Sequence, residues 1–206
     1  MKREEIVISQ PFPPFYEDLV FYAPLNENDL SDHISNVQAV SLGNGSYQWY
    51  GSEFAHKLTT NTGASLGFSI ANFANLIPNS FTIFAKVKVA VASTTFYIFS
   101  AGTYASNNCW PFVGTHNVGV ASDTSNWHDI ATVCDKSAYT QHYYKDGVLY
   151  TSLSRPANHN TWPSNWSNLL KNNVSIGTYY GYSGTAFVKD VRVYNRALTP
   201  AEVAQL

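Results

Sequence analysis

Short runs of β-forming residues, separated by turn residues, fill most of this 206-residue chain. The clearest run is residues 81–90 (FTIFAKVKVA), where apolar residues alternate with Lys86 and Lys88. Alternation with a period of two places apolar side chains on one face of a strand and polar ones on the other. Because a half-buried strand needs a second layer over its apolar face, the pattern predicts an all-β, two-sheet antiparallel sandwich. The other runs that predict strands are residues 19–23, 96–101, 127–134, 139–145, 148–153, 174–179 and 186–194.

Two local motifs add detail to this fold. Asp146-Gly147 lies between two β-type runs, and both central residues of a type I′ hairpin turn need a positive φ, which these residue types adopt readily. Thr199-Pro200-Ala201-Glu202 has the form of a capping box with proline at the first helical position. The sequence therefore predicts a tight hairpin at residue 146 and one short helix that continues to Leu206.

The first residues of the chain differ from the rest. Pro11, Pro13 and Pro14 disfavour helices and central strands and favour an extended path. We therefore expect an extended, proline-rich N-terminal arm over residues 1–17 and a single domain over residues 18–206. The arm is either a disordered leader or a segment that docks on a neighbouring copy of the chain.

Charge and composition exclude several classes of partner. The net charge is −2, and the longest basic run is Lys2-Arg3, so the clustered positive charge of a nucleic-acid-binding protein is missing. No apolar run is long enough to span a membrane, and the N-terminus lacks the apolar segment of a signal peptide. The two cysteines, Cys109 and Cys134, are either free or paired with each other.

The C-terminal stretch 187–206 (FVKDVRVYNRALTPAEVAQL) resembles the closing signature of LamG-like jelly rolls, in which a final strand is followed by a short capped helix. Residues 18–32 (DLVFYAPLNENDLSD) are similar to the family's first strand and acidic loop. Three more segments match in the expected order: FTIFAKVKV, WHDIATVCDKSAYTQHYYKDGVLYTS and NNVSIGTYYG. The resemblance covers about residues 18–206 and implies a jelly roll of the concanavalin A-like lectin–glucanase superfamily.

Within that fold, the expected positions of several residues follow. Trp127 is expected to begin a central strand and pack between the sheets. Val191 and Val193 are expected to point inward, and Arg196 to be a structural cation bonded to loop carbonyls or carboxylates. The alternative for Arg196 is an ordinary surface position.

The resemblance also implies a structural calcium ion. Many relatives hold one between the acidic residue that opens the last-strand motif and oxygens near the first strand, which makes Asp190 the candidate ligand. Oxygens of Asn26, Asn28 and Asp29 are expected to contribute to the six to eight that calcium takes. The alternative is that Asp190 bonds backbone N–H groups or Arg196.

Catalysis has weak support in the sequence. Related glucanases carry a carboxylate pair on a central strand in the motif E-x-D-x-x-E, and the retaining mechanism needs the two carboxyls about 5–5.5 Å apart. Residues 27–32 (ENDLSD) nearly match, but they follow the first predicted strand in a loop and end in Asp. Residues 63–67 match G-x-S-x-G without the following helix of a nucleophile elbow, and none of the six histidines has zinc-site spacing. We therefore expect no enzymatic activity.

Aromatic residues beside asparagines are the candidate ligand-binding residues. Sugars stack their C–H faces on aromatic rings, while amide side chains bind their hydroxyls. The segment 158–166 (NHNTWPSNW) is too polar for a strand, so its tryptophans are expected on a loop. The alternative is that such loops fold their aromatic rings over the sandwich edge as small cores. The candidates are Asn160, Trp162, Asn165, Trp166, Tyr180, Tyr182 and Trp110.

Three functions remain open at this point. The first is a non-catalytic carbohydrate-binding or adhesion module whose partner is a glycan or a cell-surface polysaccharide. The second is a virion protein, such as a phage fibre or decoration subunit, that self-associates through the N-terminal arm. The third, a glycoside hydrolase, is disfavoured by the carboxylate pattern. The first is our prediction, and either of the first two places the protein outside the cell, at a cell surface or on a virion.

Overall fold

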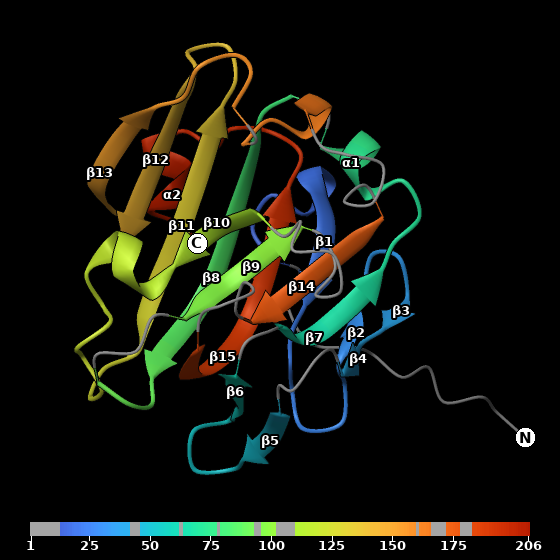
Figure 1. The fold of residues 1–206 in the computed structure, drawn as a ribbon, viewed down its shortest axis with the longest axis vertical. Helices are drawn as coiled ribbons and strands as arrows, with labels where there is room; N and C mark the ends of the chain where they lie inside the picture. The colour runs from blue at the N-terminus through green and yellow to red at the C-terminus, as the bar shows by residue number, and fades with distance from the viewer. Residues whose placement is uncertain are drawn as a thin grey trace, which may run out of the picture.

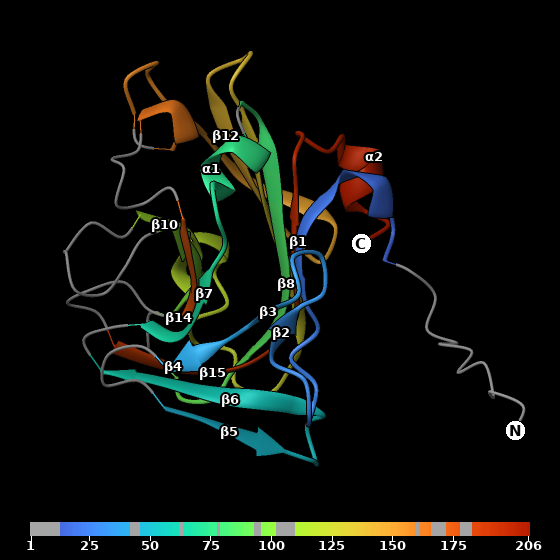
Figure 2. The ribbon, with the colours of Figure 1, turned by 90° about the vertical axis from the view of Figure 1, so that its right-hand side faces the viewer.

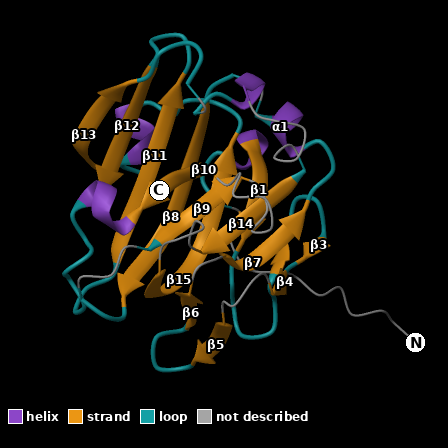
Figure 3. Ribbon diagram, in the orientation of Figure 1, coloured by secondary structure: helices purple, strands orange, loops and turns teal. Residues whose placement is uncertain are grey.

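The computed structural model is a two-layer antiparallel β-sandwich with short helices at its edges (Figure 1 and Figure 3). Figure 2 shows the two layers nearly edge-on, with the C-terminal helix on the outer side of the larger one. The fold class predicted from the sequence is confirmed. The structure describes residues 13–41, 46–61, 64–77, 79–92, 96–101, 110–159, 161–165, 172–177 and 183–206.

Within the described residues, the larger sheet has eight strands in the order β13-β12-β11-β8-β15-β6-β5, with β1 also paired to β15. All its pairings are antiparallel. Its strands are β1 (Leu19–Ala23), β5 (Ser46–Tyr50), β6 (Ala55–Asn61), β8 (Phe81–Val89), β11 (His128–Asp135), β12 (Thr140–Lys145), β13 (Val148–Ser154) and β15 (Ser183–Tyr194).

The smaller sheet covers one face of the larger one. Its described strands follow the order β10-β9-β14-β7-β4, and β2 and β3 pair beside it. These strands are β2 (Ser31–Asp32), β3 (Val37–Gln38), β4 (Val40–Ser41), β7 (Ala64–Ser69), β9 (Tyr97–Ala101), β10 (Trp110–Gly114) and β14 (Asn173–Gly177). The short helices among the described residues are η1 (Tyr16–Asp18), α1 (Phe73–Leu76), η3 (Thr115–Val118), η4 (Pro163–Asn165) and α2 (Pro200–Val203).

The main core lies between the two sheets. Strand β8 behaves as its alternation predicts, because Phe81, Ile83, Ala85, Val87 and Val89 are all buried in this core. Lys86 and Lys88 point to the opposite side, which we call the outer face of the larger sheet. Val191 and Val193 of β15 are also fully buried, as predicted.

The hairpin between β12 and β13 turns at the predicted position. Asp146 and Gly147 both have positive φ angles, 51° and 76°. A Cβ atom on Gly147 would lie 3.2 Å from the Cα of Ala204, just after α2. The turn chemistry therefore also lets the hairpin tip approach the C-terminal helix closely.

A second apolar cluster joins α2 to the outer face. Phe84, Tyr144, Tyr194, Leu198 and Val203 are buried together there. The predicted capping box is present, with Thr199 and Glu202 bonded reciprocally. Helix α2 thus covers one end of the outer face and leaves the other end open.

Arg196 ties the beginning of this domain to its end. Its Nε donates to Asp18 at 2.7 Å, and its two terminal nitrogens donate to Glu202 at 2.9 Å. The Arg196 side chain and the Thr199 backbone lower the pKa of Glu202 to about 2. The structural role predicted for Arg196 is confirmed.

The predicted N-terminal arm falls largely outside the described residues, which begin at residue 13. Phe15, near the end of the predicted arm, contacts the second cluster: its ring lies 6.5 Å from that of Tyr194 and beneath the Arg196 guanidinium. Self-association through residues 1–12 stays a prediction. No helix among the described residues is long and apolar enough to cross a membrane.

Candidate functional site

The outer face carries polar side chains in register across three neighbouring strands. Lys189 of β15 lies opposite Lys86 of β8, and Lys86 lies opposite Asp129 of β11. The residues before Lys189, after Lys86 and after Asp129 along their strands are buried in the core, so these three side chains point outward. Lys86 donates to both oxygens of Asp129 at 2.8 and 2.9 Å. A continuous polar row therefore crosses the open end of this face.

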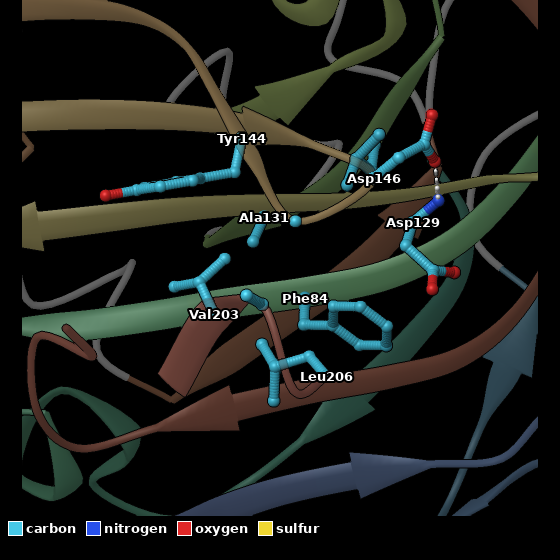
Figure 4. A pocket seen from close by; sticks show the side chains of 10 residues that line it. Phe84, Asp129, Ala131, Tyr144, Asp146, Val203 and Leu206 are labelled. Atoms are coloured by element: carbon cyan, nitrogen blue, oxygen red, sulfur yellow. Dashed lines mark hydrogen bonds between the residues drawn. The ribbon is translucent and has the colours of Figure 1, made fainter. Parts of the chain in front are cut away.

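A cleft of about 190 Å³ lies at the end of this row, between the larger sheet and α2. Figure 4 shows Asp129 and Asp146 at one end, Tyr144 at the other, and Val203 and Leu206 beside Phe84. The cleft is lined by Phe84, Asp129, Ile130, Ala131, Tyr144, Asp146, Gly147, Val203, Ala204 and Leu206. It is smaller than the roughly 300–1,000 Å³ of drug-sized sites and comparable to cavities that hold one six-membered ring.

Two carboxylates at the mouth of the cleft are held in place by hydrogen bonds. The backbone N–H of Asp129 donates to Asp146 Oδ1 at 3.0 Å, the dashed contact in Figure 4. The other oxygen of Asp146 lies 2.9 Å from His128 Nδ1. The Asp146 side chain is still 51% exposed and that of Asp129 is 37% exposed. Both carboxylates can therefore accept hydrogen bonds from a bound molecule.

His128 lies between two carboxylates beside the cleft. Its Nε2 is 3.0 Å from Asp123 Oδ2, on the side away from Asp146. Hydrogen bonds from Asn126, Ser125 and His128 hold the pKa of Asp123 well below its usual range. The imidazole thereby connects Asp146, at the tip of the β12–β13 hairpin, to Asp123, in the loop before β11.

The open end of the outer face combines lysines with aromatic rings. The Lys189 Nζ lies 4.1 Å from the centre of the Trp127 ring, and Trp127 Nε1 donates to Glu53 at 3.2 Å. The other oxygen of Glu53 accepts from Lys88 at 2.8 Å. Burial and the neighbouring Lys86 ammonium lower the pKa of Lys189.

The predicted position of Trp127 between the sheets is therefore wrong. Strand β11 alternates, with Ile130 inward and Asp129 outward. Trp127 has the same parity as Asp129, so its half-buried ring lies on the outer face. The alternation of charged and apolar residues after Trp127 is a sequence signal that indicates this orientation.

The prediction that Trp162 binds a ligand is also wrong. Its side chain is completely buried in the main core. Its Nε1 donates to the carbonyl of Pro156 at 3.0 Å, and its ring meets that of Tyr139 edge-on. Because neither ring face is exposed, a sugar cannot stack on it. The alternative reading, a loop tryptophan folded into the core, holds here.

The other predicted ligand-binding residues do not meet at a described site. Asn165 is exposed, but its amide nitrogen donates to the carbonyls of Ala157 and His159 and so stabilises its own loop. Four of the remaining candidates lie outside the described residues: Asn160, Trp166, Tyr180 and Tyr182. Trp110 lies in β10, but its side chain is outside the described part of the structure. Their role in binding stays a prediction.

The side chains of three of the four predicted metal ligands, Asp190, Asp29 and Asn26, have other partners. Both oxygens of Asp190 accept from Arg192, at 2.7 and 2.6 Å, which is a partner the sequence did not indicate. Asp29 accepts from the backbone of Ser31 at 2.9 Å and lies 2.5 Å from His33 Nε2. The side chain of Asn26 accepts from the backbone N–H of Asn28. Among the described residues, no group of three or more His, Cys, Asp or Glu residues could hold a metal ion.

As arranged, these donors do not fit a calcium ion, because an ion would have to displace Arg192 from Asp190. We therefore expect a chelator to leave the melting temperature of the protein unchanged, as followed by circular dichroism. A melting temperature that falls with chelator and recovers with calcium would contradict this expectation. The Asp190→Asn variant, measured in parallel, would then show whether Asp190 is a ligand.

The acidic loop that nearly matches the glucanase motif is structural where it is buried. Asp32 is completely buried and accepts hydrogen bonds from the backbone N–H groups of Tyr22, Ile34 and Ser35. A buried carboxylate that accepts three backbone hydrogen bonds stabilises the conformation of its loop and is not accessible to a substrate. Cys134 is free and buried, and burial raises the pKa of its thiol, which makes it unreactive.

Solved structures with a similar fold include receptor-binding domains. The binding domain of botulinum neurotoxin DC in complex with SialylT has a TM-score of 0.59 at 11% identity. The same domain in complex with rat synaptotagmin II has 0.59 at 12%, and the receptor binding domain of the botulinum neurotoxin C/D mosaic serotype has 0.60 at 10%. Each match covers 91% of this chain and 50% of the other, so this chain spans about half their length. At such low identity the likeness shows the fold alone.

Sequence comparison identifies the family directly. No curated protein matches the chain in sequence. The family model Laminin_G_3, described as the concanavalin A-like lectin/glucanases superfamily, matches residues 60–204. This range includes β8, β11 to β15 and α2, which carry most of the resemblance noted in the sequence, whereas residues 18–32 lie outside the match. The chain therefore belongs to the concanavalin A-like lectin/glucanase superfamily.

Proposed function

We propose that the protein is a non-catalytic glycan-binding module and that the outer face around the cleft is its binding site. The observation that carries the proposal is the cleft itself, which has room for one ring and has two accessible carboxylates, Asp129 and Asp146, at its mouth. Carboxylates that accept from sugar hydroxyls form charge-assisted hydrogen bonds, which are stronger than neutral ones.

The size of the cleft indicates how a glycan is bound. Because the cleft is small, only one sugar ring can enter it, and the rest of the glycan must lie along the outer face. Lys189 is two strands from Asp129, about 10 Å at the usual strand spacing, so neighbouring sugars can reach it. The lectin-like fold and the receptor-binding domains that share it support a binding role.

The test is a glycan array followed by titration of any glycan that binds. Asp146→Asn removes the charge but keeps the size of the side chain. Asparagine also tolerates the positive φ that Asp146 adopts, so the turn should be retained. We expect this variant to bind about tenfold more weakly, because a hydrogen bond to a charged group is worth about 1.5 kcal/mol or more.

The matched control is Asp135→Asn, at the opposite end of β11, where the carboxylate caps its own turn through Ser137. Its affinity should equal that of the wild type. If the wild-type protein binds no glycan, or if the two variants lose affinity equally, the proposed site is wrong.

A further inference from the structure

The lysines of this chain are concentrated on the outer face. Four of its eight lysines, Lys57, Lys86, Lys88 and Lys189, lie there on the adjacent strands β6, β8 and β15. Phe187 lies in register between Lys57 and Lys88. We call these four lysines the lysine patch.

Two of these lysines have no carboxylate partner. Lys86 is paired with Asp129, and Lys88 with Glu53. Among the described residues, no carboxylate lies within ion-pair distance of Lys57 or Lys189. The patch and its two carboxylate partners therefore carry a local charge of +2, on a chain whose net charge is −2.

Ammonium groups of the lysine patch lie over neighbouring aromatic rings. The Nζ of Lys57 lies 5.3 Å from the centre of the Tyr50 ring. Lys88 lies 6.0 Å from the Phe187 ring, and Lys189 lies 4.1 Å from the Trp127 ring. Each distance is within the range of a cation–π contact. The ring faces that would stack on a neutral sugar thus carry positive charges instead.

We infer that the lysine patch binds an anionic group, a carboxylate or a sulfate, on the glycan whose other end lies in the cleft. This inference rests on the proposed function and adds the chemical class of the ligand. Lys57 and Lys189 supply ammonium groups that form no ion pair among the described residues, and the Tyr50 and Trp127 rings lie beside those groups. The ammonium group of Lys189 also donates to the backbone carbonyl of Glu53 at 3.4 Å. Asp129, at the mouth of the cleft, pairs with Lys86 of the patch, so the face changes from acidic at the cleft to basic at the patch. A glycan that lies along it is therefore expected to carry its anionic group at the end away from the cleft.

The test compares two polymers that differ in charge but share one backbone, dextran sulfate and dextran, with polygalacturonate and its methyl ester as the carboxylate pair. We expect the charged member of at least one pair to bind to the wild-type protein and the neutral member to bind much more weakly. Affinity should fall as ionic strength rises, because salt screens exposed charges. The double variant Lys57→Gln/Lys189→Gln should lose about tenfold in affinity for the charged polymer.

The control is Lys136→Gln/Lys145→Gln, which removes the same charge outside the patch. Equal losses in the two double variants would mean that only the net charge matters and would overturn the inference. Neutral polymers binding as well as charged ones would also overturn it, while the proposed glycan-binding function would stand. If neither these polymers nor any glycan on the array binds, the proposed function fails as well.

Discussion

Replacing Trp162 with alanine should destabilise the protein by about 3–5 kcal/mol, the usual cost of removing a large aromatic side chain from a core. The indole is completely buried, and its N–H bonds the carbonyl of Pro156. The variant loses apolar contacts and leaves a cavity, and that carbonyl loses its donor. The free energy of unfolding in urea, followed by tryptophan fluorescence and circular dichroism, measures the effect.

Two further variants separate the causes of this loss. Trp162→Phe keeps most of the buried ring but removes the hydrogen bond, so we expect a smaller loss. Tyr139→Ala removes a 45% exposed ring that contacts Trp162 edge-on, and it should cost about 1 kcal/mol or less. A Trp162→Ala protein that is as stable as the wild type but has lost glycan binding would contradict the structure and restore Trp162 as a ligand-binding residue.

Removal of the Asp32 carboxylate has the second largest expected effect. Asp32→Ala leaves three backbone N–H groups without their acceptor, two of them now bonded at 2.8 Å. Buried donors that lose a charged partner cost about 1–3 kcal/mol each before the loop relaxes, so we expect a net loss of about 3 kcal/mol in the free energy of unfolding. Equilibrium denaturation measures this loss.

The control for Asp32 lies in the same loop. Glu27 is exposed, and Glu27→Gln should change stability by about 0.5 kcal/mol or less. Asp32→Asn keeps one acceptor oxygen and should fall between the wild type and Asp32→Ala. If Asp32→Ala were fully stable and instead abolished a hydrolytic activity on a glucan, the acidic loop would be catalytic and our reading of it wrong.

The strands that could be predicted from the sequence are those with clear alternation or an apolar run. Strand β1 has the predicted bounds, and β8 and β12 differ from theirs by one residue. In β5 (SYQWY), Tyr47 and Trp49 alternate with Ser46 and Gln48, but the run has no aliphatic residue and the strand is largely exposed at the edge of the sheet, so its local pattern did not identify it. Local patterns indicate which face of a strand is buried but not which strands are neighbours.

The same limit explains what the sequence missed in the candidate site. Alternation placed Lys86 and Lys88 on the exposed side of their strand, and the turn at Asp146 was predicted. That Lys189, Trp127 and Glu53 meet beside them depends on β15 and β11 pairing with opposite edges of β8, which no local pattern contains. The prediction for Trp162 failed because a polar segment can still bury one large ring.

The strand order of the larger sheet has a consequence for how the protein is made. Strand β15 lies between β8 and β6 and also pairs with β1, although it follows every other strand in the sequence. During synthesis, the edges of β8 and β6 that pair with β15 therefore stay unpaired until nearly the whole domain has been made. Pairing between segments so distant in sequence is slow, and open strand edges are prone to aggregate. We therefore expect the larger sheet to close only after its last strand, β15, has been synthesised, and the edges of β8 and β6 to be the segments most prone to aggregate before then.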